Sequence, residues 1–274
     1  MSTTTRPSSL LSRRSFHTCR CTCLQQSIVQ RHLEQQRRAG SYRLTSFPEP
    51  PPLTSVESRM ATKLFAKPAR FLTSVFDPKQ IPPFKQPEIA FVGRSNVGKS
   101  TLINRLTNNS KLVKTSSKPG HTKSLNFFNI ADQITLVDMP GYGFRSQEEW
   151  GELILHYLRY REQLKRLYII IDPVAGIKET DKQIMQILDQ QPLSYQVILT
   201  KRDRLTDEAF QKSKSQIERY LVEHAICCYP EILTTGKRRK SKKDQVGQMA
   251  QDIARIQWSV MTAAGVTPTP PSSS

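Results

Sequence analysis

The sequence predicts an α/β fold of three layers, in which a mostly parallel sheet is covered by helices on both faces. Strand-like and helix-like segments alternate from residue 88 to residue 262, the order typical of such a sheet. Several of the strand-like segments are continuously apolar, as expected of strands that are buried on both faces. A glycine-rich turn, Gly93–Gly98, separates the first of these strands from the first helix. Together these features indicate one α/β domain of about 200 residues.

Six segments have the composition of strands, and five have the pattern of helices. The strands are expected at Glu88–Val92, Leu125–Ile130, Gln133–Val137, Arg166–Ile171, Gln196–Leu199 and Glu231–Leu233. The helices are expected at Lys99–Thr107, Glu148–Gln163, Asp181–Gln190, Asp207–His224 and Asp244–Thr262. Thr180 and Thr206 stand at the start of two of these helices and are candidate N-caps. Ala131-Asp132 joins the second and third strands, which predicts an antiparallel hairpin.

The composition points to a polyanionic partner. The 274 residues include 41 basic and 23 acidic side chains, for a net charge of +18. Such an excess favours nucleic acid first among possible partners. Hydrophobic residues make up 37% of the chain, which is enough for a core. No segment approaches the roughly 18 consecutive apolar residues of a membrane helix, so no membrane span is expected.

The first 60 residues differ in composition from the rest. They contain nine arginines, no lysine and three glutamates, and the first 33 residues contain no acidic residue. A basic, hydroxyl-rich start is typical of a mitochondrial presequence, and a disordered basic arm is the alternative. Residues 1–60, which include a stiff proline-rich linker at Phe47–Leu53, are expected to precede a folded domain at 61–265. Residues 266–274 are expected to form a disordered tail.

The motif Gly93-Arg-Ser-Asn-Val-Gly-Lys-Ser100 predicts a phosphate-binding loop. It matches G-x-x-x-x-G-K-S and stands between an apolar strand and a helix, where backbone N–H groups converge on phosphates. Lys99 supplies a positive charge for the β- and γ-phosphates, and the Ser100 hydroxyl is a candidate Mg²⁺ ligand. The expected binding residues are Gly93, Arg94, Ser95, Asn96, Val97, Gly98, Lys99, Ser100 and Thr101.

Thr200-Lys-Arg-Asp203 predicts that the nucleotide base is guanine, with GTP or GDP as the ligand. A carboxylate at Asp203 can accept hydrogen bonds from guanine N1–H and from its exocyclic amine, which adenine cannot match. Lys201 would lie along the base, and Thr234 and Thr235 after the last strand could offer a backbone N–H to guanine O6. A surface turn with an ordinary charge pair is the alternative for this segment, and its position after a strand favours base recognition.

Two further segments are candidates for sensing the γ-phosphate. Asp138-Met-Pro-Gly141 ends a strand, so that Asp138 can hold Mg²⁺ through water and the Gly141 N–H can contact the γ-phosphate. The segment Lys118–Lys123 lies in a loop rich in Ser, Thr and Lys, which suits a switch that the γ-phosphate orders, with Thr122 as its hydroxyl ligand. The expected catalytic residues are therefore Lys99, Thr122 and Gly141, and the expected metal ligands are Ser100 and Thr122.

With these motifs in this order, the chain resembles the TRAFAC-class GTPases and is most similar to the EngB family. The likeness covers roughly residues 70–262 and rests on Pro87–Asn104, Pro119–Thr122, Asp138–Gly143 and Thr200–Leu205. It implies a Ras-like sheet of six strands with five helices, binding of GTP and Mg²⁺, and a role in assembly of the large ribosomal subunit. With a presequence, that role would lie in the mitochondrial matrix, on the mitochondrial ribosome or its rRNA. We expect a monomer.

The chain departs from the family pattern in three places. The stretch after Gly143 is short, Asp172–Gly176 replaces a more polar loop, and Thr234-Thr235 replaces paired serines. Tyr142 stands where Ras-type enzymes have a glutamine that orients the attacking water. The resemblance implies a hydrophobic residue in place of that glutamine, and Tyr142 is consistent with this. This predicts slow intrinsic hydrolysis, on the order of 10⁻⁴ s⁻¹ or below.

Three alternatives stay open on the sequence. Asn96 either helps to coordinate K⁺, as in cation-activated relatives, or is a loop asparagine that tolerates unusual backbone angles. The basic run Lys237–Lys243 contacts rRNA phosphates, serves as a nuclear signal or forms a solvated loop. For the chain as a whole, the alternative to a GTP-gated assembly factor is a basic RNA-binding module with a vestigial nucleotide site.

Overall fold

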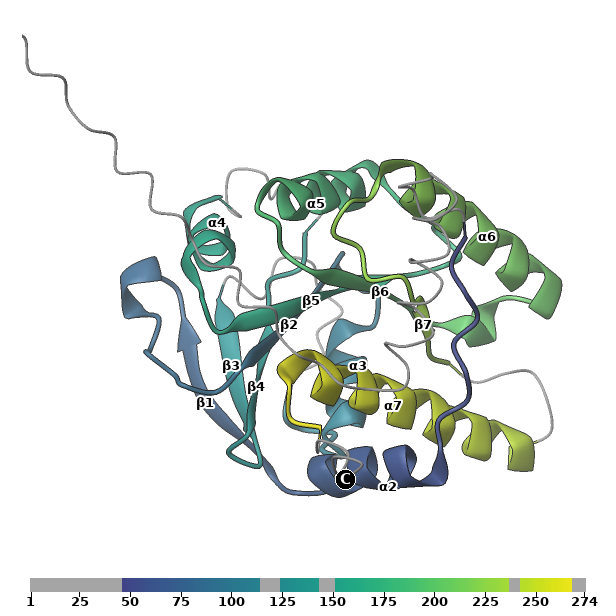
Figure 1. Cartoon of the computed structure of the whole chain (residues 1–274), viewed down its shortest axis with the longest axis horizontal. Helices are drawn as coiled ribbons and strands as arrows, with labels where there is room; N and C mark the ends of the chain where they lie inside the picture. Colours follow the sequence, from purple (N-terminus) through teal and green to yellow (C-terminus); the bar gives the residue numbers. More distant parts are fainter. Residues whose placement is uncertain (1–45, 114–123, 143–150, 237–241, 268–274) are drawn as a thin grey trace, which may run out of the picture.

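The computed structural model describes residues 46–113, 124–142, 151–236 and 242–267, and these residues form three layers (Figure 1). The middle layer is a sheet in the order β1-β3-β4-β2-β5-β6-β7. Its strands are β1 (Ala69–Val75), β2 (Glu88–Gly93), β3 (Leu125–Ile130), β4 (Ile134–Asp138), β5 (Leu164–Ile171), β6 (Tyr195–Leu199) and β7 (Leu233–Thr234). The pairs β4–β2, β2–β5, β5–β6 and β6–β7 are parallel, whereas β3 is antiparallel to both β4 and β1.

Helices cover both faces of the sheet. One face carries α4 (Gly151–Tyr160), α5 (Glu179–Gln190) and α6 (Asp207–His224), and the other carries α2 (Ser55–Phe65), α3 (Lys99–Leu106) and α7 (Lys242–Ala264) (Figure 1). Each helix layer buries its apolar residues in a separate core cluster against the sheet. The three-layer α/β prediction is confirmed. In the described part of the chain, no helix has the length and apolar character that a bilayer crossing requires.

The expected strands and helices are all present among the described residues, with ends shifted by a few positions. The predicted hairpin joins β3 to β4, and its turn residues Ala131 and Asp132 have φ of +55° and +58°. Two successive positive φ angles are what a two-residue hairpin turn of type I′ requires. Thr206 caps α6 as predicted, since its hydroxyl accepts the N–H of Ala209 at 3.2 Å.

The Thr180 cap was a wrong prediction. Helix α5 begins at Glu179, so Thr180 lies inside its first turn and cannot be the cap. The carboxylate of Asp181 accepts the N–H of Lys178, the N-cap residue, at 2.7 Å instead. A carboxylate at the third helical position can satisfy this donor and also benefits from the helix dipole.

Two elements at the N-terminal side were not predicted from the sequence. Helix α2 starts in a capping box, in which Thr54 and Glu57 each accept the other's backbone N–H at 3.2 and 2.7 Å. It buries Ala61, Leu64 and Phe65 in the cluster that α7 also lines. Strand β1 then pairs with β3 at the edge of the sheet and makes it seven-stranded rather than six-stranded. The boundary expected at residue 60 therefore falls inside a packed helix.

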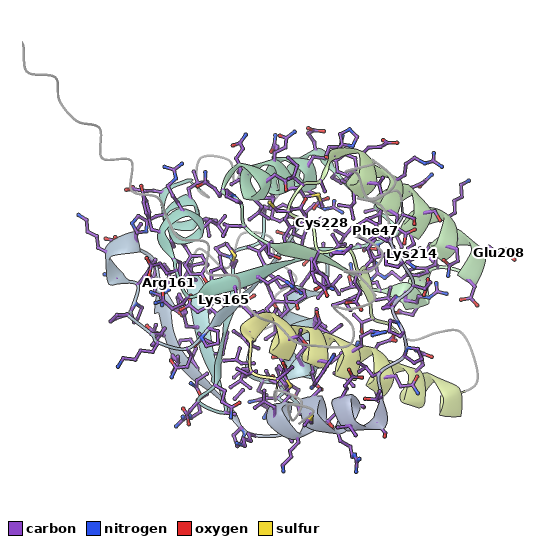
Figure 2. The ribbon with its side chains drawn as sticks, viewed as in Figure 1. Phe47, Arg161, Lys165, Glu208, Lys214 and Cys228 are labelled. Atoms are coloured by element: carbon purple, nitrogen blue, oxygen red, sulfur yellow. The ribbon has the colours of Figure 1, made fainter. Side chains whose placement is uncertain are left out.

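The proline-rich segment Phe47–Leu53 is attached to the domain. Glu49 forms an ion pair with Lys214 of α6 at 2.8 Å, and the Pro51 carbonyl accepts a hydrogen bond from Arg255 of α7. Phe47 and Leu53 pack against the two core clusters. Figure 1 shows this segment running from α2 past β7 to α6, and Figure 2 labels Phe47 and Lys214 on that side. The segment is extended as predicted, but it forms part of the folded unit.

Candidate functional site

The phosphate-binding motif lies at the carboxyl end of β2, between that strand and α3. Gly98 is the residue before α3 and has φ of +100°, a backbone conformation that glycine adopts without strain. At Gly93 a Cβ atom would lie 2.8 Å from both the Ile170 carbonyl oxygen and Val97 Cγ2. The two glycines of the motif are thus required by the shape of the turn. Val97 is buried in the core below the loop, whereas Asn96 and Thr101 are exposed.

Lys99 and Asp138 meet at this edge of the sheet. Asp138 ends β4, which pairs in parallel with β2, so the carboxyl ends of the two strands are neighbours. The Lys99 ammonium forms an ion pair with Asp138, and both residues are buried, with side chains 10% and 2% exposed. Ser100, half-buried, is the next residue of α3. The predicted phosphate-binding lysine and the predicted magnesium-side carboxylate are therefore in direct contact.

The segment Gly141-Tyr142 lies against the phosphate-binding loop. The Tyr142 N–H donates to the Gly93 carbonyl and the Ser95 N–H donates to the Tyr142 carbonyl, both at 3.3 Å. A Cβ atom on Gly141 would lie 3.4 Å from Ser95 N, which shows how closely the two segments approach. Thr122, the predicted hydroxyl ligand in Lys118–Lys123, lies outside the described residues, as does the stretch after Tyr142 up to residue 150.

The side chain of Tyr142 is buried and turned away from solvent. It is 3% exposed, and its hydroxyl donates to Asp181 Oδ1 at 2.6 Å. Burial, followed by the nearby Asp181 carboxylate, raises the pKa of Tyr142 well above its usual value, so the phenol stays protonated and acts as a donor. A hydroxyl that is already donating to a buried carboxylate does not serve as a replacement for a water-orienting glutamine.

The predicted base-recognition segment contacts the phosphate-binding loop directly. Thr200, just after β6, donates its hydroxyl to the Val97 carbonyl at 2.6 Å. Lys201 Nζ donates to the Asn96 carbonyl at 2.5 Å and forms an ion pair with Asp172 at 2.8 Å. Lys201 itself has φ of +52°, which turns the chain into the short 3₁₀ helix Arg202–Arg204. Sequence reasoning did not assign Asp172, although its position directly after β5 was a usable signal.

Asp203 is exposed, and the residues around it are firmly held. Arg202 is buried, stacks on the Phe210 ring with its guanidinium carbon 3.8 Å from the ring centre, and forms an ion pair with Asp207. The loop after β7 lies alongside, since the Thr235 N–H donates to the Leu199 carbonyl at 2.8 Å. A Cβ atom on Gly236 would lie only 2.5 Å from Arg202 N. The structure therefore brings the Thr234–Gly236 loop next to the Asp203 segment.

Arg94 and Asp181 complete the described site. The Arg94 guanidinium approaches Asp181 Oδ2 at 3.5 Å. Sequence reasoning placed Arg94 among the nucleotide-binding residues and considered Asp181 only as the start of a helix. The available signal was an acidic residue three positions into a helix that follows a central strand.

The residues at this edge fit a magnesium ion that is shared with a bound nucleotide. Ser100 offers a hydroxyl and Asp138 a buried carboxylate, the oxygen donors that Mg²⁺ prefers. Within the described ranges, no group of three or more His, Cys, Asp or Glu side chains could enclose a metal. An ion here would depend on phosphate oxygens and water for its remaining ligands, which is usual for magnesium in nucleotide sites.

Comparisons with known proteins agree with this geometry. The family model described as "50S ribosome-binding GTPase" matches residues 88–201. A probable GTP-binding protein EngB from Gluconobacter oxydans is 40% identical over 192 residues, which is 68% of this chain and 84% of that protein. The protein of the same name from Rickettsia bellii is 47% identical over 150 residues, 53% of this chain and 71% of that protein.

A solved structure gives the same answer for the fold. A dimerization-deficient mutant of Toc33 from Arabidopsis thaliana superposes with a TM-score of 0.50 at 17% identity, over 77% of this chain and 93% of that chain. At this identity the likeness concerns the fold alone, whereas the sequence relatives above extend over most of the domain. From the glycine-rich loop to the base-recognition segment, the chain belongs to the EngB family of GTP-binding proteins.

Proposed function

We propose that this protein is a GTP-gated factor for the mitochondrial large ribosomal subunit, which docks on a precursor particle in its GTP state and leaves after hydrolysis. Its family makes it a GTP-binding protein and a GTPase. The roles of individual residues, the ribosomal particle and the compartment are proposed here. The observation that carries the nucleotide part is the pair of contacts from Thr200 and Lys201 to the phosphate-binding loop. They join the two recognition segments into one site.

The bound triphosphate would be held at the carboxyl ends of β2 and β4. Lys99 would exchange its ion pair with Asp138 for the β- and γ-phosphates, and the Gly141 N–H would contact the γ-phosphate. Asp138, released from Lys99, could then hold magnesium through water while Ser100 and Thr122 ligate the ion directly. A magnesium ion held there would supply positive charge beside the phosphate oxygens. Each of these residues thereby has a task that its chemistry allows.

Guanine would be read by Asp203 and the Thr234–Gly236 loop. The exposed carboxylate of Asp203 is available for the two donors of guanine, and the anchored Arg202 holds its backbone in place. The ammonium group of Lys201 is fixed between the Asn96 carbonyl and the Asp172 carboxylate. The same anchoring opposes the rival interpretation, a basic RNA-binding module with a vestigial nucleotide site.

Intrinsic hydrolysis is expected to be slow. The Tyr142 hydroxyl is committed to Asp181 and so does not replace the water-orienting glutamine. We expect single-turnover rates on the order of 10⁻⁴ s⁻¹ for the isolated protein. A rate near 1 s⁻¹ would contradict this expectation.

A role of Asn96 toward K⁺ is the finer proposal. Asn96 has φ of +64°, an angle that asparagine adopts more readily than most residues, which also supports a purely conformational role. Hydrolysis rates compared in potassium and sodium chloride test the two interpretations, because only a coordinated K⁺ raises the rate in potassium selectively.

The ribosomal and mitochondrial parts rest on charge and on the N-terminal composition. The net charge of +18 favours rRNA, and the acid-free, arginine-rich first 33 residues favour import into mitochondria. The basic run Lys237–Lys243, whose side chains lie outside the described residues, is the proposed rRNA contact. Changing its basic residues to glutamine should reduce the salt dependence of RNA binding, and an unchanged slope would exclude this contact.

Cofractionation tests the proposed function as a whole. The full chain is expected to sediment with large-subunit precursors from mitochondria in the presence of a non-hydrolysable GTP analogue, and to be released by GDP. The Asp203→Asn variant, which should no longer recognise guanine, is the matched control. Sedimentation that is the same with every nucleotide, or a protein found outside mitochondria, would contradict the proposal.

A further inference from the structure

Asp181 is a buried carboxylate that none of the proposed nucleotide contacts uses. The residue is 0% exposed, its two oxygens accept hydrogen bonds from two segments, and the arginine of a third segment approaches as an ion-pair partner. Oδ1 accepts the Tyr142 hydroxyl at 2.6 Å, and Oδ2 accepts the Lys178 N–H at 2.7 Å and lies 3.5 Å from Arg94 Nε. One carboxylate therefore joins the segment after Gly141, the start of α5 and the phosphate-binding loop.

These contacts offset only part of the cost of burying a charge, because the pKa of Asp181 stays above its ordinary value. Burial raises the pKa of Asp181, whereas the Tyr142 hydroxyl, the Lys178 N–H and the Arg94 guanidinium act in the opposite direction. A buried carboxylate that loses a donor is strongly disfavoured, so the three partners are held in fixed positions around it. Tyr142 makes the shortest of the three contacts, and its side chain is almost completely shielded from solvent.

Tyr142 is fixed at both its backbone and its side chain. Its N–H and carbonyl bond to Gly93 and Ser95 of the phosphate-binding loop, and its hydroxyl bonds to α5 through Asp181. Gly141 is the preceding residue, and only its own two backbone angles separate its N–H from the peptide group that Tyr142 anchors, so the position of Tyr142 limits where the Gly141 N–H can lie. A displacement of the tyrosine ring would move the peptide group that is proposed to contact the γ-phosphate.

We propose that Asp181 is a positioning residue for γ-phosphate recognition: by holding the Tyr142 hydroxyl it sets the place of the Gly141 N–H, and so the preference for GTP over GDP. This rests on the role of Gly141 in the proposed function. A GDP molecule lacks the γ-phosphate and does not depend on this arrangement. Loss of the bond between Tyr142 and Asp181 therefore weakens binding of the triphosphate selectively.

The test uses Tyr142→Phe, Asp181→Asn and the double variant in the full chain. Calorimetry measures the affinities for GDP, for a non-hydrolysable GTP analogue and for the matching ATP analogue. A hydrogen bond to an ionised group changes an equilibrium about 10-fold or more. Each single variant is expected to lower the ratio of GTP-analogue to GDP affinity by about this factor. The double variant should lower it little further than Tyr142→Phe alone, because Asp181→Asn removes the charge of the acceptor and Tyr142→Phe removes the donor of the same hydrogen bond.

Tyr157→Phe is the matched control. Tyr157 is also fully buried, lies in the same core cluster, and donates its hydroxyl to a buried carboxylate, Glu88, at 2.9 Å. Among the described residues its ring contacts Phe127 of β3, away from the phosphate-binding and base-recognition segments. Removal of the Tyr157 hydroxyl should lower the melting temperature and leave the ratio of GTP-analogue to GDP affinity unchanged. A purely structural role of Asp181 predicts the same behaviour for Tyr142→Phe, and that result would overturn the proposal.

The outcomes also separate this inference from the proposed function. If the wild-type protein prefers GTP to ATP and the Tyr142→Phe ratio is unchanged, only the positioning role fails. If the wild-type protein does not distinguish GTP from ATP, the proposed function fails first. Should Asp181→Asn not fold, Tyr142→Phe still decides the matter, since it removes one oxygen atom and keeps the ring.

Discussion

Replacing Gly236 with alanine is expected to weaken guanine nucleotide binding through a collision with the Asp203 segment. The backbone of Gly236 has φ of +148°, a conformation that residues with side chains rarely adopt. Its new Cβ atom would lie 2.5 Å from Arg202 N and 2.7 Å from Arg202 Cβ. Arg202 cannot easily move aside, because it is buried against Phe210 and ion-paired with Asp207.

The size of the effect follows from these distances. To reach an ordinary contact of 3.4 Å, the two backbones must separate by at least 0.9 Å, the difference between 3.4 and 2.5 Å. Asp203 is the next residue and is expected to move with Arg202. A bidentate contact to a base contributes about 1–3 kcal/mol. Losing it should lower the affinity for both GTP and GDP by roughly 10- to 100-fold, and ATP affinity should not change.

Gly265→Ala serves as the matched control for backbone strain. Gly265, after α7, also has a positive φ of +70°, but a Cβ atom there would meet nothing within 4 Å. Both variants should lose about 1–3 kcal/mol of stability from the unfavourable conformation. Calorimetry with GTP, GDP and ATP then isolates the collision. If Gly236→Ala binds GTP as tightly as Gly265→Ala does, the placement of Asp203 by this loop is refuted.

Three further predictions concern other contacts of the fold and site. In the Arg161→Ala variant, the buried carboxylate of Glu88 at the start of β2 keeps the Tyr157 hydroxyl as a donor but loses its charged partner (Figure 2 labels Arg161). The free energy of unfolding measured in urea should therefore fall by about 3–5 kcal/mol. A fall of less than about 1 kcal/mol is incompatible with that estimate. Lys99→Ala should abolish triphosphate binding and also destabilise the protein, because it leaves the buried carboxylate of Asp138 without its ion-pair partner. Adding Asp138→Asn should restore stability without restoring binding. Calorimetry measures the binding and thermal unfolding measures the stability. Phe47→Ala should lower the free energy of unfolding by about 1–2 kcal/mol, which is less than the roughly 3–5 kcal/mol of a fully buried phenylalanine, because Phe47 is only half-buried against the core. Unchanged thermal unfolding would show that the proline-rich segment is not part of the folded unit.

The central strands and the phosphate-binding loop could be predicted because their signals are local. Continuous apolar runs such as Leu167–Ile171 identify strands buried on both faces, and Ala131-Asp132 leaves room only for a tight turn. The glycine pattern fixes the loop geometry, as the close approach at Gly93 and the positive φ of Gly98 show. Each of these features is determined by a few neighbouring residues.

The elements that were missed depend on distant partners. β1 exposes Phe71 and Leu72 and pairs only at the sheet edge, so its sequence has neither a continuous apolar run nor strict alternation. α2 is stabilised by packing against α7, which lies nearly 180 residues later in the chain. The partners of Asp181 come from residues 94, 142 and 178, a convergence that no local pattern reveals.

The central claim, that one site at the carboxyl edge of the sheet reads both a triphosphate and guanine, is tested most directly by calorimetry of the full chain with GTP and ATP in the presence of magnesium. The account predicts that GTP binds about 10⁴-fold more tightly than ATP or better, and that Asp203→Asn removes this preference while the protein stays folded. Equal affinity for GTP and ATP in the wild-type protein, or a preference that survives in Asp203→Asn, would contradict it.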